Sequence, residues 1–195
     1  MTGSPARQSR YATVAIILHW TSAALVLTNV GLAWYFGTLV GTERVAVIQW
    51  HKPIGITVLL LTVVRILWRL THKPPPLPPM AAWERVAAGV VHTLFYIFLI
   101  AMPLTGWAMV SASRTILAFP ISFGLFDWPA ISPLTNLPRP QMHEVHKLMT
   151  QSHEALAWLA YALITLHVGA ALMHQFVHRD GVLGRMVPFL KARPA

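Results

Sequence analysis

Histidine is the residue type in this 195-residue chain whose positions most clearly indicate chemistry, because six of the ten histidines lie in or beside long apolar stretches. Ionisable side chains at such positions are costly in a membrane, so a functional role is the default expectation. The alternative for any single one is a neutral imidazole that is hydrogen-bonded between helices. The absence of cysteine excludes thiolate-bound iron–sulfur clusters and cysteine-type zinc sites. The six histidines are His19, His51, His92, His153, His167 and His174.

Four apolar stretches must position these side chains. Hydrophobic residues make up 55% of the chain and charged residues only 11%, which is typical of a membrane protein. Stretches over about 11–36, 47–70, 86–112 and 155–177 are each long enough to cross a bilayer as a helix. We therefore predict an all-α, integral membrane four-helix bundle that forms a single domain over residues 1–195. The net charge of +9 comes from residues that flank these stretches, so no nucleic-acid partner is expected.

The basic residues predict the orientation of the bundle. Ten of the fifteen lysines and arginines fall on the side that holds both chain ends, and five fall on the other side. The positive-inside rule then places both termini in the cytoplasm of a multi-pass inner-membrane protein surrounded by lipid. The ten are Arg7, Arg10, Arg65, Arg69, Lys73, Arg85, Arg179, Arg185, Lys191 and Arg193, and the five are Arg44, Lys52, Arg114, Arg139 and Lys147.

Helical geometry gives each membrane histidine a depth. His153 and His167 are fourteen residues apart on the last stretch, so they share nearly one face and lie about 21 Å apart along the axis. They cannot bind one metal ion. The antiparallel arrangement puts His51 at the outer depth of His153 and His19 at the inner depth of His167. Two imidazole pairs stacked in a bundle suit two haem b groups, each with its iron held from both sides.

Other polar side chains lie at the same two depths. Arg65 and Arg69 are candidates for haem propionates, with membrane-edge snorkelling as the alternative, and Lys52 is a candidate for an outer propionate or an anion. His92 lies at the inner depth and is a candidate iron ligand, propionate partner or quinone contact. His174 and Arg65 are also candidate quinone contacts.

Small and aromatic residues complete the prediction. Glycines within the stretches permit close approach of a macrocycle or another helix. The outer connection, 113–150, is expected to fold over the bundle mouth, and its HEVH sequence holds only two ligand candidates, a weak metal signal. The glycines are Gly31, Gly55, Gly106 and Gly169, the connection's aromatic residues are Phe119, Phe123, Phe126 and Trp128, and its histidines are His143 and His146.

Four segments together resemble the bacterial cytochrome b561 family of small dihaem membrane proteins, which is related to the cytochrome b subunits of nickel–iron hydrogenases. They are AIILHWTSAALV, HKPIGITVLLLTVVRILWRLTHKPPPLP, HTLFYIFLIAMPLTGWAMVSA and SHEALAWLAYALITLHVGAALMHQFVHRDGVLGRMVP. By motif, the resemblance places the family's axial ligands on His19, His51, His153 and His167. Pro53 replaces an expected smaller polar residue, and we expect it in a helix's first turn, where proline is tolerated.

The resemblance implies electron transfer between an outer one-electron donor and ubiquinone, with superoxide as the preferred donor. The enzyme class would then be a membrane-bound oxidoreductase of superoxide:ubiquinone type. The alternative is the membrane-anchoring cytochrome b subunit of a larger dehydrogenase or hydrogenase, with a docked redox protein as donor. A haem-free transporter is disfavoured because none of the six acidic residues lies in mid-span. A homodimer stays open.

Overall fold

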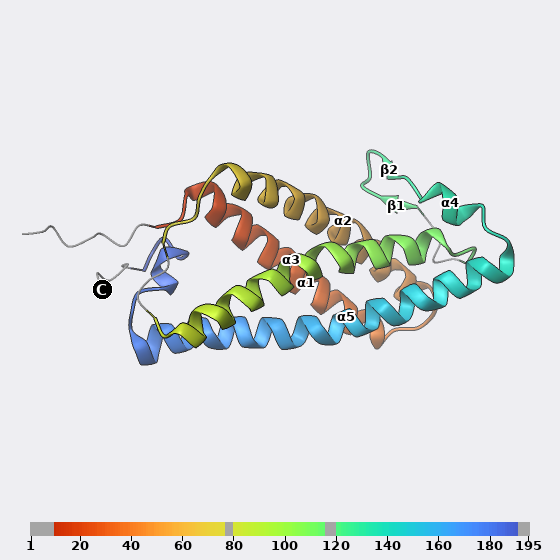
Figure 1. Cartoon of the computed structure of the whole chain (residues 1–195). Helices are drawn as coiled ribbons and strands as arrows, with labels where there is room; N and C mark the ends of the chain where they lie inside the picture. The colour runs from red at the N-terminus through yellow and green to blue at the C-terminus, as the bar shows by residue number, and fades with distance from the viewer. Residues whose placement is uncertain (1–9, 77–79, 116–119, 191–195) are drawn as a thin grey trace, which may run out of the picture.

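The computed structural model describes residues 10–76, 80–115 and 120–190, and in them four long helices form a bundle (Figure 1). All four are long and apolar enough to cross a membrane, so the predicted all-α membrane bundle is confirmed. The long helices are α1 (Thr13–Gly37), α2 (Gly41–Thr71), α3 (Ala82–Ser111) and α5 (Arg139–Met173), and the last continues through a π-helical turn, His174–His178.

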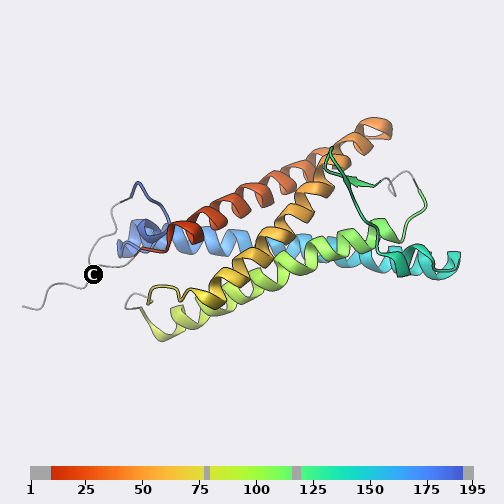
Figure 2. The same ribbon diagram turned by 90° about the horizontal axis from the view of Figure 1, so that it is seen from above.

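Consecutive long helices run in opposite directions, which gives the bundle two distinct ends (Figures 1 and 2). We call the end that holds Thr13, Thr71, Ala82 and His178 the terminal end, and the opposite one the loop end. At the terminal end, the segment after α5 closes over the start of α1. Its carbonyl groups accept hydrogen bonds from Arg10, Tyr11 and Trp20, and its Arg185 donates to the Pro76 carbonyl, 2.7 Å away.

Some basic and aromatic residues named in the sequence predictions lie outside the residues that the structure describes. They are Arg7, Lys191, Arg193 and Phe119.

The core is small and the apolar surface is large. Val58, Phe98, Leu99, Ala160 and Leu163 form the central buried cluster, which joins α2, α3 and α5. Backbone packing is close between α1 and α2, between α3 and α5, and between α2 and α3. Large apolar side chains on all four helices point outward and are exposed. An exposed apolar girdle suits lipid, whereas in water it would favour aggregation.

The outer connection differs from the prediction in its second half. Helix α5 begins at Arg139, well before the apolar stretch that starts near residue 155. Pro140 lies in the first turn, where its missing N–H costs no helical hydrogen bond. The polar segment that follows remains helical because α5 packs against α3, and the His146 Nδ1 lies 2.9 Å from the Met109 carbonyl.

The first half of the connection folds back as predicted, in the part that the structure describes. Strands β1 (Ile121–Ser122) and β2 (Asp127–Trp128) form an antiparallel hairpin, and the short helix α4 (Ser132–Thr135) follows it. The rings of Trp128 and Trp107 meet edge to face with 5.7 Å between their centroids. The hairpin is thereby attached to the loop end of α3.

Pro53 does not lie in a first turn, so that expectation is wrong. Helix α2 starts at Gly41, and Pro53 lies inside it. Because proline has no N–H, the carbonyl of Gln49 loses its usual helical partner one turn later. The helix nevertheless continues, and the Thr57 hydroxyl donates to the Pro53 carbonyl at 2.8 Å. This irregular turn includes His51.

Candidate functional site

The histidines predicted to share the outer depth lie beside each other near the loop end, with 70° between their ring planes. The ring centroids of His51 on α2 and His153 on α5 are 6.3 Å apart. Phe36, in the last turn of α1, meets His51 edge to face at 5.5 Å. Three helices therefore converge on this pair.

Thr105 determines how His153 presents its ring. The Thr105 hydroxyl donates to the Met102 carbonyl at 2.8 Å, and its oxygen lies 3.0 Å from the His153 Nδ1. Since its own proton is engaged, the hydroxyl oxygen accepts the Nδ1–H of the imidazole. The proton therefore lies on Nδ1, and the lone pair on Nε2 is left available for a metal.

Gly106 makes the position of the His153 ring sterically possible. A Cβ atom added to Gly106 would lie 3.2 Å from Cε1 of that ring, closer than ordinary packing allows. The other predicted glycines have looser surroundings. An added Cβ on Gly55 would lie 3.5 Å from the Asn29 amide nitrogen, and Gly31 and Gly169 have no such neighbour within 4 Å.

His51 lacks the hydrogen bond that orients His153. Its Nδ1 is buried and makes no hydrogen bond of ordinary geometry, although the backbone of Asn29 lies beside the ring. The Oδ1 of Asn29 is likewise buried and unpaired. Buried polar atoms without partners are uncommon in native proteins and mark sites that need an explanation. Both orphaned atoms lie at the outer histidine pair.

Three histidines meet at the inner depth. The centroid of the His167 ring on α5 lies 6.1 Å from that of His19 on α1 and 5.7 Å from that of His92 on α3. Trp20 and Phe95 pack edge to face against His19 and His167, each with centroids 5.3 Å apart. His92 and His19 are thus at similar distances from His167.

The predicted basic residues divide between the two levels. Arg65 reaches the inner group, where its guanidinium lies 3.4 Å from the His19 Nδ1 and 5.9 Å from the centre of the Tyr96 ring. Arg69 lies one turn further along α2, exposed, and its charge is near enough to act on His92. Lys52 is buried beside the outer pair, with its Nζ 3.3 Å from the Gln49 side-chain oxygen.

His174 lies apart from the other candidate quinone contacts. Its Nδ1 is 2.5 Å from a carboxylate oxygen of Asp180, and its ring adjoins that of His178. In the described part of the chain, His174 makes no hydrogen bond or ring contact with Arg65 or His92. Sequence reasoning missed Asp180 and Thr105, since neither stands in a distinctive motif. One signal could have found Thr105. It lies beside Gly106 on α3, at a depth in the bundle that matches His153 on α5.

Comparisons with known proteins identify the family of this chain. The family model described as prokaryotic cytochrome b561 matches residues 10–189. The chain is 32% identical to cytochrome b561 homolog 2 of Escherichia coli K12, with 91% of each chain covered, and 29% identical to homolog 1 of the same organism, with 92% of this chain and 98% of the relative covered. It is 33% identical to the probable superoxide oxidase CybB of Yersinia pestis, over 92% of this chain and 96% of that protein.

A match along almost the whole chain, on a bundle of four membrane-crossing helices, identifies a multi-pass membrane cytochrome of the b type that takes part in electron transfer. Family membership implies haem b as the cofactor. The chain belongs to the prokaryotic cytochrome b561 family.

Proposed function

We propose that this chain binds two haem b groups, one between His51 and His153 and one between His19 and His167. The ring spacings support this. Two imidazoles that held one iron from opposite sides would need ring centres about 6 Å apart, given about 2 Å for each iron–nitrogen bond and about 1 Å from each nitrogen to its ring centre. The centroid distances of 6.3 and 6.1 Å agree with this value.

The surroundings of the pairs also suit a bound macrocycle. Thr105 and Gly106 hold the His153 ring with its Nε2 available. Arg65, Arg69 and Lys52 supply positive charge at the two depths, where the propionates would need it. Haem b supplies reversible one-electron oxidation and reduction when bound, and the protein contributes ligation, orientation and burial.

We infer that electrons enter at the loop end and leave for ubiquinone at the terminal end. Superoxide is the donor that we favour, because a relative covered over nearly its whole length is named a probable superoxide oxidase. Exposed Arg114, Arg139 and Lys147 at the loop end suit an anionic donor. For the acceptor, Arg65 and His92 offer donors at the inner level, and His174 is hydrogen-bonded to Asp180 nearer the terminal end. The positive-inside rule would place that end in the cytoplasm.

The test of this function is haem quantitation combined with reduced-minus-oxidised spectra on purified variants. We expect His51→Ala and His167→Ala each to lose one haem, because each removes one of two axial ligands. His19→Ala should lose the same haem as His167→Ala, whereas His92→Ala should retain both. His143→Ala is the matched control, since it changes an exposed histidine of α5. Two normal haems in both His51→Ala and His167→Ala would refute the ligand assignment.

A second test separates this function from the alternative, a membrane-anchor subunit of a larger dehydrogenase or hydrogenase. Such a subunit would bind the same haems but receive electrons from a docked protein. If the isolated chain reduces ubiquinone with superoxide as the only donor, the enzyme proposal stands. If it is inactive alone and co-purifies with an iron–sulfur subunit, the alternative replaces it.

A further inference from the structure

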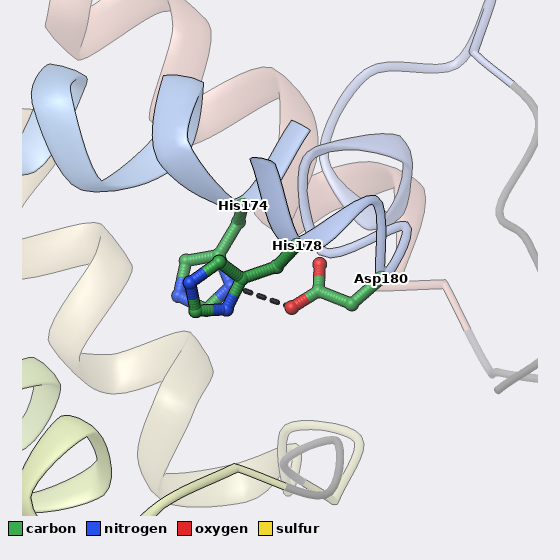
Figure 3. Close-up of side chains that lie close together, drawn as sticks. All are labelled: His174, His178 and Asp180. Atoms are coloured by element: carbon green, nitrogen blue, oxygen red, sulfur yellow. Dashed lines mark hydrogen bonds and ion pairs between the residues drawn. The ribbon is translucent and has the colours of Figure 1, made fainter. Parts of the chain in front are cut away.

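Three side chains of types that can ligate metals converge where α5 ends (Figure 3). The Nδ1 of His174 lies 2.5 Å from the Oδ2 of Asp180, and the centroids of the His174 and His178 rings are 5.1 Å apart. One donor atom from each of the three residues falls within 4.8 Å of the others. The electron-transfer proposal gives no role to His178 or to the convergence itself.

The backbone is shaped to bring these side chains together. A π-helical turn, His174–His178, carries the two histidines, and Arg179 follows in the left-handed conformation with φ of 53°. Among the described residues, Arg179 is the one non-glycine residue with positive φ. This conformation is unfavourable for a residue with a Cβ and is kept where surrounding structure requires it. Here it turns the chain so that Asp180 faces His174.

Backbone N–H groups orient the two carboxylates at this site. The Oδ1 of Asp180 accepts a hydrogen bond from the Val182 N–H at 3.1 Å, which leaves Oδ2 directed at His174. Glu84 on α3 accepts the Ala81 N–H through one oxygen, at 3.0 Å, and its other oxygen lies 3.8 Å from the His178 Nδ1. Two acidic groups from separate segments therefore flank two imidazoles.

We propose that His174, His178 and Asp180 form a binding site for a divalent transition-metal ion of the zinc class. Zinc takes imidazole nitrogen and carboxylate oxygen at about 2.0–2.2 Å in a tetrahedral arrangement, with three protein ligands and an open position as one common form. Magnesium and calcium prefer oxygen ligands alone. The Asp180 and His178 side chains are 23% and 35% exposed, so an ion can enter from the surface.

Binding would require small movements only. Ligand atoms around a tetrahedral zinc ion lie about 3.4 Å apart. The His174–Asp180 contact would therefore open by about 1 Å, and the other separations, all within 4.8 Å, would close by at most about 1.4 Å. The hydrogen bond between His174 and Asp180 would be replaced by two bonds to the metal, because the metal-bound nitrogen and oxygen atoms carry no proton.

The site would also regulate electron transfer, a consequence that rests on the proposed function. A bound ion would occupy His174, which is one of the candidate quinone contacts. Quinone reduction should therefore slow when zinc binds. The metal site itself does not depend on this link.

Zinc binding can be measured without turnover. We expect the detergent-purified holoprotein, dialysed against buffered micromolar zinc, to retain one zinc ion per chain, measured together with haem iron by elemental mass spectrometry. His178→Ala and Asp180→Asn should weaken zinc binding about tenfold or more while haem content stays the same. His143→Ala should bind zinc as the unaltered protein does, since it alters the other histidine pair, His143 and His146. Zinc that is absent from the unaltered protein, or that is lost in His143→Ala and kept in His178→Ala, would overturn the site.

A kinetic arm separates this inference from the proposed function. Zinc should slow ubiquinone reduction by the unaltered protein and have little effect on His178→Ala. If zinc binds while the protein reduces no quinone under any condition, the metal site stands and the proposed function fails. If zinc binds at this site and the rate is unchanged, the regulatory link is wrong.

Discussion

Thr105 shows how one hydroxyl group can prepare a ligand. By accepting the Nδ1–H of His153 while donating to Met102, it fixes both the tautomer and the ring orientation. Hydrogen bonds to the far nitrogen of a ligating imidazole increase its basicity and hold it in place. His51 has no such partner on Nδ1. The two ligands of the proposed outer haem are therefore unequal.

Replacing Thr105 tests this role. In Thr105→Val the shape is kept and the acceptor is lost, so His153 becomes a weaker electron donor to the iron. We expect a higher midpoint potential for the outer haem and an unchanged one for the inner haem, measured by potentiometric titration of the haem absorption bands. Thr105→Ser should restore the original value. An outer-haem potential that does not respond to valine would remove Thr105 from the proposed site.

The same residues show how much of the candidate site could be predicted from the sequence. Depth along a helix follows from residue number, so the pairing of His51 with His153 could be predicted from spacing and orientation. Which atom faces which could not, because Thr105 acts from a neighbouring helix. At the inner depth, His19 and His92 lie at similar distances from His167, so neither spacing nor ring distance alone decides the ligand.

Helices α3 and α5 must approach closely for His153 to face the bundle interior, and Gly106 lies where they meet. We expect Gly106→Val to reduce the content of the outer haem selectively, because the added carbon atoms displace the His153 ring. The measurement is haem quantitation with separate spectra of the two haems. Gly89→Val is the matched control on α3, where a Cβ meets nothing within 4 Å. Equal haem loss in both variants would indicate general damage to the helix.

The helix boundaries show which parts of the fold could not be predicted from the sequence. The four apolar stretches predicted the membrane helices well, since twenty consecutive apolar residues have few alternatives. The polar first turns of α5 were missed because no apolar run marks them. Asp180 was missed because its approach to His174 depends on the left-handed Arg179, which has no distinctive sequence signal. Pro53 was assigned to a first turn because α2 starts six residues earlier than the predicted stretch.

For the whole molecule, charge at the loop end should control the encounter with an anionic donor. Arg114, Arg139 and Lys147 are exposed there, and attraction between exposed charges is screened by salt. We expect the rate of superoxide oxidation to fall steeply with ionic strength, measured by stopped-flow reduction of the haems. A double variant, Arg139→Gln with Lys147→Gln, should react more slowly at low salt and respond less to added salt. A flat response in the unaltered protein would argue against steering.

Helix α5 contributes one histidine to each level, and this has a consequence for how the family can change over evolutionary time. A single inserted codon between His153 and His167 would rotate one imidazole by about 100° relative to the other, so only one of them could still face inward. A seven-residue insertion would restore the facing but move the two proposed haem positions about 10 Å further apart. Among descendants of this gene, insertions and deletions should therefore accumulate in the hairpin and the chain ends. The number of residues between His153 and His167 on α5 should stay constant.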